Sequence, residues 1–118
     1  MDITILGRIG YDLYSEEPNV PLPQVRRFSR YLGGSSANMA VGLARLGAKV
    51  GIVASLGNDS LSEYLIHFLK SEKVDTIHVK TAPGYLPSLC LTEVSPPDHF
   101  PQVFYRRDPV DTRLDVTA

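Results

Sequence analysis

The residues best suited to chemistry stand between Gly33 and Asn38, where the sequence reads GGSSAN. Two adjacent glycines let a ligand approach the backbone closely, because no Cβ stands in the way. A helix that begins after them presents unpaired backbone amides, which suit hydroxyls or a carboxylate. Asn38 can both donate and accept hydrogen bonds, as a sugar diol requires. The same segment also fits an ordinary glycine loop followed by a helix cap, so the spacing alone leaves both interpretations open.

Asp12, Tyr105 and Arg106 offer further polar chemistry. Asp12 follows the first apolar run and Gly10, and ligands of open α/β sheets bind at the carboxyl ends of strands, where a carboxylate can hold two hydroxyls. A solvated loop acid is the alternative for this aspartate. An arginine fork such as that of Arg106 pairs well with a carboxylate, and an aromatic neighbour can pack on a sugar face. The alternative for this pair is an edge strand whose charges guard against aggregation.

Several other kinds of site do not match the sequence. Gly7 and Gly10 follow the first strand-like run, but the third glycine of G-x-G-x-x-G is missing, and G-x-x-x-x-G-K-[ST] occurs nowhere. The single cysteine, Cys90, excludes an internal disulfide framework and a cysteine-cluster metal site. The three histidines have no ligand spacing, so we expect no metal site.

Composition narrows the class of protein. The chain has 118 residues, of which 43% are hydrophobic and 21% charged, with a net charge of -1. These values are typical of a globular protein, and the interspersed charges indicate no nucleic-acid partner. No signal-peptide leader is visible, and no apolar run approaches the roughly 20 residues that span a bilayer. We therefore expect a soluble cytoplasmic protein with no membrane partner.

The elements that must position these residues alternate between strand and helix. Apolar periodicity predicts a strand at 3–6, a helix at 35–46, a strand at 49–54, a helix beginning near 59 and a strand at 77–79. At the second helix, Asp59 competes as the cap with a capping box formed by Ser60 and Glu63. The order of elements predicts a parallel α/β layer.

The remaining segments predict a second kind of structure. Residues 14–23 hold three of the nine prolines and are expected to be extended or looped, and residues 25–32 fit an edge strand. Two strand-like runs at 86–94 and 102–106 are joined by a proline-rich turn. We interpret these two runs as an antiparallel hairpin that covers another part of the molecule.

Taken together, these segments resemble the PfkB, or ribokinase-like, family of carbohydrate kinases. The family signature is Gly-Gly followed by Asn, a small-residue helix, Leu-Gly-Ala and a strand ending in Gly-x-Asp; here it reads GGSSANMAVGLARLGAKVGIVASLGND. The opening GRIGYDLY and the later LCLTEVSPPDHFPQVFYR are similar to the sugar-acid kinases of this family. One departure is Ser62, near a place where the family often has glycine, which concerns local packing more than function.

The resemblance implies a ribokinase-like α/β fold, a parallel sheet flanked by helices with a small β lid. Residues 1–118 would form the N-terminal part of one such domain, with lid segments at about 14–32 and 86–106. The lid forms a homodimer interface in many relatives, so a homodimer is a further expectation. The resemblance implies that Asp12, Gly34 and Asn38, with Ser35 beside them, bind the hydroxyls of the substrate. It also implies that Tyr105 and Arg106 bind the acid end of a sugar-acid substrate.

The implied reaction is transfer of the γ-phosphate of ATP to a sugar or sugar acid, with Mg²⁺. The family's catalytic aspartate belongs to a later G-x-G-D motif, which does not occur by Ala118. The base and most ATP contacts are therefore expected beyond Ala118, and this segment alone is expected to be inactive. The alternatives are another kinase of the family, such as one acting on 2-keto-3-deoxygluconate, fructose or ribose, and a non-catalytic α/β module that binds a small polar ligand.

Overall fold

The computed structural model describes residues 2–113, which form two sheets and two α-helices. One sheet contains β1 (Ile3–Leu6), β4 (Val50–Leu56) and β5 (Val79–Thr81) in the order β1-β4-β5, and both of its strand pairs are parallel. Helix α1 (Ser35–Arg45) leads into β4, and α2 (Ser60–Ser71) connects β4 to β5. The predicted parallel α/β layer is confirmed.

Strand β4 and the two helices form the core of this layer. β4 is buried along both faces except at Val53, as expected of a central parallel strand. The helices cover it with apolar residues at helical spacing. The most buried of these are Ala37, Ala40 and Val41 on α1 and Leu65 and Leu69 on α2. The small side chains of α1 let this helix lie close to the sheet.

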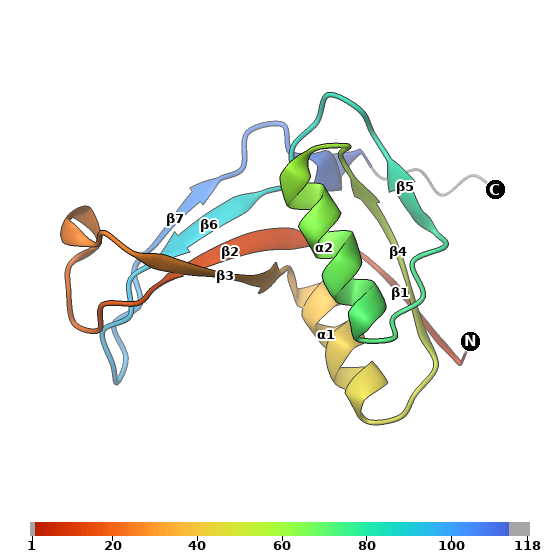
Figure 1. Cartoon of the computed structure of the whole chain (residues 1–118), viewed down its shortest axis with the longest axis horizontal. Helices are drawn as coiled ribbons and strands as arrows, with labels where there is room; N and C mark the ends of the chain where they lie inside the picture. Colours follow the sequence, from red (N-terminus) through yellow and green to blue (C-terminus); the bar gives the residue numbers. More distant parts are fainter. Residues whose placement is uncertain (1, 114–118) are drawn as a thin grey trace.

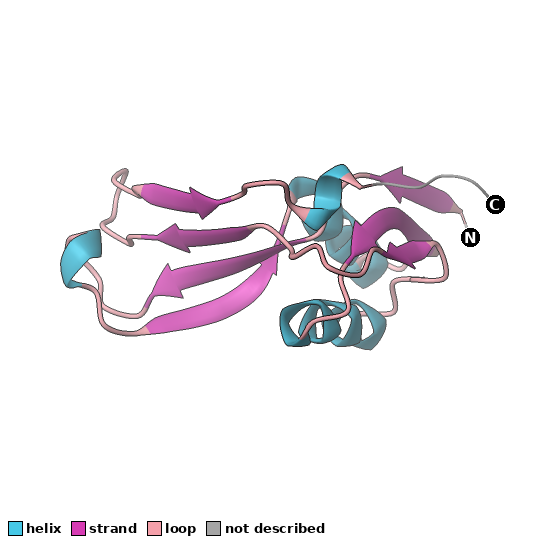
Figure 2. Ribbon diagram, turned by 90° about the horizontal axis from the view of Figure 1, so that it is seen from above, coloured by secondary structure: helices cyan, strands magenta, loops and turns pink. Residues whose placement is uncertain are grey.

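A four-stranded sheet extends to one side of the layer (Figures 1 and 2). It consists of β2 (Gly10–Ser15), β3 (Phe28–Gly33), β6 (Leu89–Thr92) and β7 (Gln102–Tyr105), in the order β3-β2-β6-β7. β6 and β7 are antiparallel, which confirms the predicted hairpin, and β3 lies at an edge, as predicted. β2 and β3 are also antiparallel, whereas β2 and β6 run parallel.

The first part of this sheet corrects the sequence-based expectation. β2 begins at Gly10 and includes Tyr14, whereas the sequence predicts an extended or looped segment from residue 14 to residue 23. Asp12 therefore lies within β2 and not in a loop past the first strand. Aspartate has a low intrinsic preference for strands, but β2 is paired on both sides, with β3 and with β6, and this pairing decides the conformation.

Of the two caps that the sequence predicts for the second helix, the structure has the one formed by Asp59. Asp59 is the N-cap, and its Oδ1 accepts a hydrogen bond from the Ser62 amide at 3.0 Å. The buried Ser62 hydroxyl donates to Asp59 Oδ2 and accepts from the Gly57 amide. The serine that departs from the family pattern is thus fully hydrogen-bonded. Within residues 2–113, neither helix has the length and apolar character needed to cross a bilayer.

Candidate functional site

The candidate site lies where the four-stranded sheet meets the start of α1. Gly33 ends β3, and Gly34 is the N-cap of α1 with φ +90°. A Cβ on Gly34 would lie 2.6 Å from the backbone oxygen of Arg8, and a Cβ on Gly33 would overlap the Asp12 carboxylate. The two glycines therefore let Asp12 and the backbone of Arg8 approach the first turn of the helix.

Asn38 lies one turn into α1. Its Nδ2 donates a hydrogen bond to the Gly34 carbonyl at 3.1 Å, and the same carbonyl accepts the Asn38 backbone amide. The Asn38 residue is exposed, so its Oδ1 and second N–H remain accessible to a ligand. Ser35, the first residue of the helix, is also exposed. Asp12 thus lies against Gly33, and Asn38 is bonded to the adjacent Gly34.

Asp12 is half-buried, and among residues 2–113 its carboxylate has no hydrogen-bond partner. Burial raises the pKa of Asp12, and the positive charge of Arg8 opposes this shift. A partly desolvated carboxylate without a donor is suited to accept hydrogen bonds from a ligand's hydroxyls. Asp12 therefore offers unpaired acceptors to a ligand at this site.

Cys90 lies beside Asp12 on the neighbouring strand. Burial raises the pKa of its thiol, and its Sγ lies 3.6 Å from Thr92 Oγ1. A thiol with a raised pKa stays protonated at neutral pH and is a poor nucleophile. Cys90 therefore lies beside Asp12 as a protonated, buried thiol.

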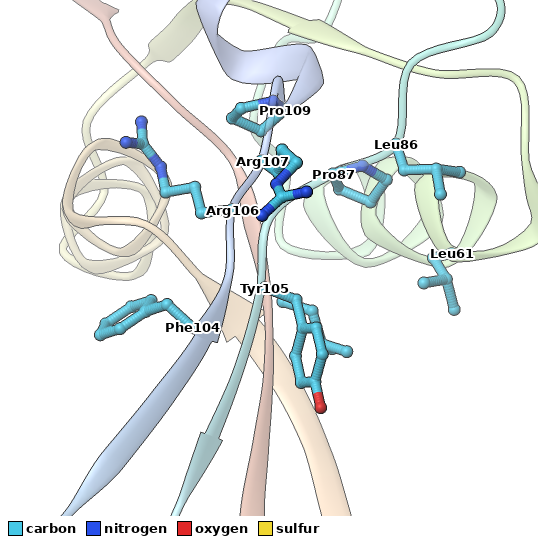
Figure 3. Close-up of a pocket in the computed structure, with 9 residues that line it drawn as sticks. Leu61, Leu86, Pro87, Phe104, Tyr105, Arg106, Arg107 and Pro109 are labelled. Atoms are coloured by element: carbon cyan, nitrogen blue, oxygen red, sulfur yellow. The ribbon is translucent and has the colours of Figure 1, made fainter.

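Strand register divides the four-stranded sheet into two faces. Asp12, Cys90 and Phe104 stand in one row across β2, β6 and β7, which we call the Asp12 face. Tyr105 is on the opposite face, because side chains of a strand alternate. Figure 3 shows Phe104 and Arg106 on one side of the chain and Tyr105 on the other, toward Leu61 of α2. Of the predicted pair, only Arg106 shares the side of Phe104.

Tyr105 lines a pocket of about 880 Å³ at the end of β7, together with Phe104 and Arg106. The other lining side chains are mostly apolar and include Leu61, Leu86 and Pro87. The structure does not bring Tyr105 together with Asp12, Gly34 and Asn38. Phe104, which the sequence analysis did not select, is the aromatic residue on the Asp12 face.

Arg106 already has an internal partner. Its Nη2 donates to Asp111 Oδ1 at 2.7 Å, and the Asp111 side chain is only 1% exposed. The Arg106 side chain is 43% exposed, so the other donors of the guanidinium remain accessible. A ligand carboxylate at Arg106 would share the guanidinium with Asp111.

Arg8 is a second residue of the site that the sequence analysis did not select. It connects β1 to β2, and its Nη1 donates to Ser88 Oγ at 3.3 Å. Its position directly after β1, where ligands of open α/β sheets bind, is the signal that could have identified it. Within the described residues, no group of three or more His, Cys, Asp or Glu side chains could hold a metal ion.

Comparisons with known proteins show which family this chain is similar to. Residues 1–110 match the family described as pfkB family carbohydrate kinase. The 5-dehydro-2-deoxygluconokinase of Clostridium perfringens (strain ATCC 13124) is 38% identical over 116 residues, which are 98% of this chain and 34% of that protein. The chain thus spans about a third of the length of the curated relatives it matches.

Solved structures show the same fold. The fructokinase of Halothermothrix orenii is 31% identical with a TM-score of 0.86, and the match covers 100% of this chain and 41% of that one. An uncharacterized sugar kinase from Pyrococcus horikoshii in complex with ATP is 31% identical with a TM-score of 0.84, over 92% of this chain and 35% of that one. The predicted ribokinase-like α/β fold is therefore confirmed.

Proposed function

This chain belongs to the pfkB family of carbohydrate kinases, and from that membership we propose that it is the substrate-binding part of a sugar-acid kinase. The parent kinase transfers the γ-phosphate of ATP to the terminal hydroxyl of 5-dehydro-2-deoxy-D-gluconate, a reaction of myo-inositol breakdown. Relatives named 5-dehydro-2-deoxygluconokinase, 34–38% identical to nearly the whole chain, support this substrate. The observation that carries the proposal is the group formed by Asp12, Gly34 and Asn38 at the start of α1.

Each residue of the group has a defined task. Asp12 accepts hydrogen bonds from sugar hydroxyls, and Asn38 offers its accessible Oδ1 and N–H to the same hydroxyls. Gly34 lets the sugar approach the backbone, with Ser35 beside it at the helix terminus. The family resemblance assigns the acid end to Tyr105 and Arg106, and the side chain of Arg106 is the better placed of the two.

The rest of the proposal concerns the whole kinase. Residues 1–118 are the N-terminal part of one domain, in which segments 14–32 and 86–106 serve as a lid over the sugar and as a homodimer interface. An ATP complex of a similar sugar kinase supports ATP as the phosphate donor. The family resemblance assigns the contacts to Mg²⁺, most contacts to ATP and the catalytic base to other parts of a cytoplasmic parent kinase.

The test is a substrate panel for the parent kinase. ADP release is measured with 5-dehydro-2-deoxygluconate, 2-keto-3-deoxygluconate, fructose and ribose. We expect the highest kcat/KM with 5-dehydro-2-deoxygluconate. A higher value with 2-keto-3-deoxygluconate or fructose would reassign the substrate. Sugar binding without any ADP release would support the non-catalytic binding module instead.

A further inference from the structure

Two arginines flank the site, and they differ in what they already bind. Arg106 is paired with the buried carboxylate of Asp111 at 2.7 Å. Arg8 forms no ion pair with any residue between 2 and 113, and its hydrogen bond to Ser88 joins it to a neutral hydroxyl. Asp12 acts on Arg8 only through its nearby charge and forms no hydrogen bond to it. The guanidinium donors of Arg8 are therefore freer than those of Arg106 to bind an added carboxylate.

The backbone fixes where Arg8 stands. Its carbonyl oxygen is the atom that a Cβ on Gly34 would meet, so Arg8 contacts the N-cap of α1 directly. Its guanidinium extends over Gly10, since Nη1 lies 3.6 Å from the position that a Cβ of Gly10 would take. Gly10 precedes Asp12 by two residues on β2 and therefore shares its face of the sheet. The guanidinium is thus on the Asp12 face, next to the glycine pair.

The charge of Arg8 acts on its neighbours from this position. It opposes the upward shift of the pKa of Asp12 and that of Cys90, both of which lie on the Asp12 face. Arg8 itself is half-buried, and partial burial strengthens its electrostatic interactions relative to those of a fully solvated arginine. Asp12 and Arg8 therefore present an acceptor and a cationic donor side by side, and neither is saturated by the described residues.

We propose that Arg8 binds the carboxylate of the sugar acid while Asp12 binds an adjacent hydroxyl, an inference that rests on the proposed function. 5-Dehydro-2-deoxygluconate is a β-hydroxy acid, so one molecule offers a carboxylate and a nearby hydroxyl to these two groups. The guanidinium fork binds the carboxylate through charge-assisted hydrogen bonds. Arg8 is then a residue that determines specificity for acids over neutral sugars.

A purely structural role predicts a different outcome. If Arg8 only compensated the charge of Asp12, its removal would impair neutral and acidic ligands alike. The proposal requires a selective loss for the acid. The methyl ester of the same sugar acid is the matched neutral probe, because it keeps every hydroxyl and replaces the charged carboxylate with a small neutral ester.

The experiment compares the KM of the free acid with that of its methyl ester in the parent kinase and three variants. In Arg8→Gln we expect the KM of the acid to rise roughly ten- to hundred-fold, because a charged hydrogen bond is lost. The KM of the ester and the kcat should change little. Arg8→Lys should recover part of the loss, because it keeps the charge but not the fork. Arg106→Gln should raise the KM of the acid less than Arg8→Gln does, because Arg106 remains paired with Asp111 in the parent kinase.

Equal effects of Arg8→Gln on acid and ester, or a larger effect of Arg106→Gln, would overturn the proposal. If Arg8→Gln fails to fold, an unchanged KM of the acid in Arg8→Lys would overturn it. Failure of the proposed function has a separate signature. If the unaltered parent kinase does not phosphorylate the acid, both proposals fall, whereas an active kinase with no selective loss in Arg8→Gln contradicts only the role of Arg8.

Discussion

The parallel layer and the four-stranded sheet use their side chains differently. In the parallel layer, Ile52 of the central strand β4 and Leu65 of α2 are at most 1% exposed, although the edge strand β1 is mostly exposed. In the four-stranded sheet, Tyr31, Phe104 and Tyr105 are each more than half exposed. Large exposed aromatic residues on a sheet indicate a surface that contacts another molecule or another part of the protein. The comparison indicates that the layer supplies stability and the four-stranded sheet supplies a binding surface.

The largest expected effect tests stability in the two regions. Leu65→Ala removes a fully buried side chain of α2 and should lower the free energy of unfolding of the parent kinase by roughly 2–5 kcal/mol. Val103→Ala, on the half-exposed strand β7, should change it by less than about 1 kcal/mol. Urea denaturation measures both. Equal losses would show that the four-stranded sheet contributes as much to the stability of the fold as the layer does.

The second prediction compares two glycines of α1, one at its N-cap and one in its interior. Gly34→Ala places a Cβ against the Arg8 carbonyl at a positive φ, so we expect a cost of roughly 1–3 kcal/mol and a raised KM for the sugar. Gly42 lies in the interior of α1 with open space around it, and Gly42→Ala should stabilise the protein by about 0.5–1 kcal/mol. Thermal denaturation and sugar kinetics measure both variants. A tolerated Gly34→Ala with an unchanged KM would remove Gly34 from the site.

A third effect concerns how the four-stranded sheet holds its outer loop. The buried Glu93 accepts hydrogen bonds from the Leu22 amide and the Ser95 hydroxyl, both at 2.8 Å. Glu93→Gln weakens these charge-assisted bonds, so we expect amide exchange at Leu22 to accelerate about ten-fold or more. Glu16, whose bond to Ser29 is exposed, provides the control, and Glu16→Gln should leave exchange at Leu22 unchanged. Equal protection in both variants would contradict the anchoring role of Glu93.

The smallest effect is a gain in stability at the site itself. Burial raises the pKa of Asp12 in the folded protein above its unfolded value, so stability falls as the pH rises through these two values. Asp12→Asn removes this cost, and we expect a slightly higher Tm at neutral pH. The difference from the unaltered protein should disappear below the ordinary aspartate pKa of about 3.9. A Tm that falls at neutral pH would show that the charge of Asp12 stabilises the fold.

The difference between the parallel layer and the four-stranded sheet also explains which parts of the fold the sequence could predict. The parallel layer follows from local signals, namely the apolar run of β4, the small-residue face of α1 and the cap at Asp59. The full extent of strand β2 is not predictable from local sequence. Its conformation depends on a parallel pairing with β6, which is remote along the chain.

The candidate site was predictable in part for the same reason. Gly34 and Asn38 lie within one local motif, and the sequence places them correctly on one helix terminus. Alternation along β7 is itself local, so it could have separated Tyr105 from Arg106 and drawn attention to Phe104. The hydrogen bond from Arg8 to Ser88 joins residues far apart in the chain, and composition and spacing do not contain such a contact. The pairing of Arg106 with Asp111 is local, so it could have been considered.

The most direct test of the binding surface is a calorimetric titration of the parent kinase with 5-dehydro-2-deoxygluconate, before and after the replacement Asp12→Ala. Loss of the carboxylate that accepts the sugar hydroxyls should raise Kd by roughly ten-fold or more. An unchanged Kd in a folded variant would show that the sugar binds elsewhere and that the Asp12 face has another purpose.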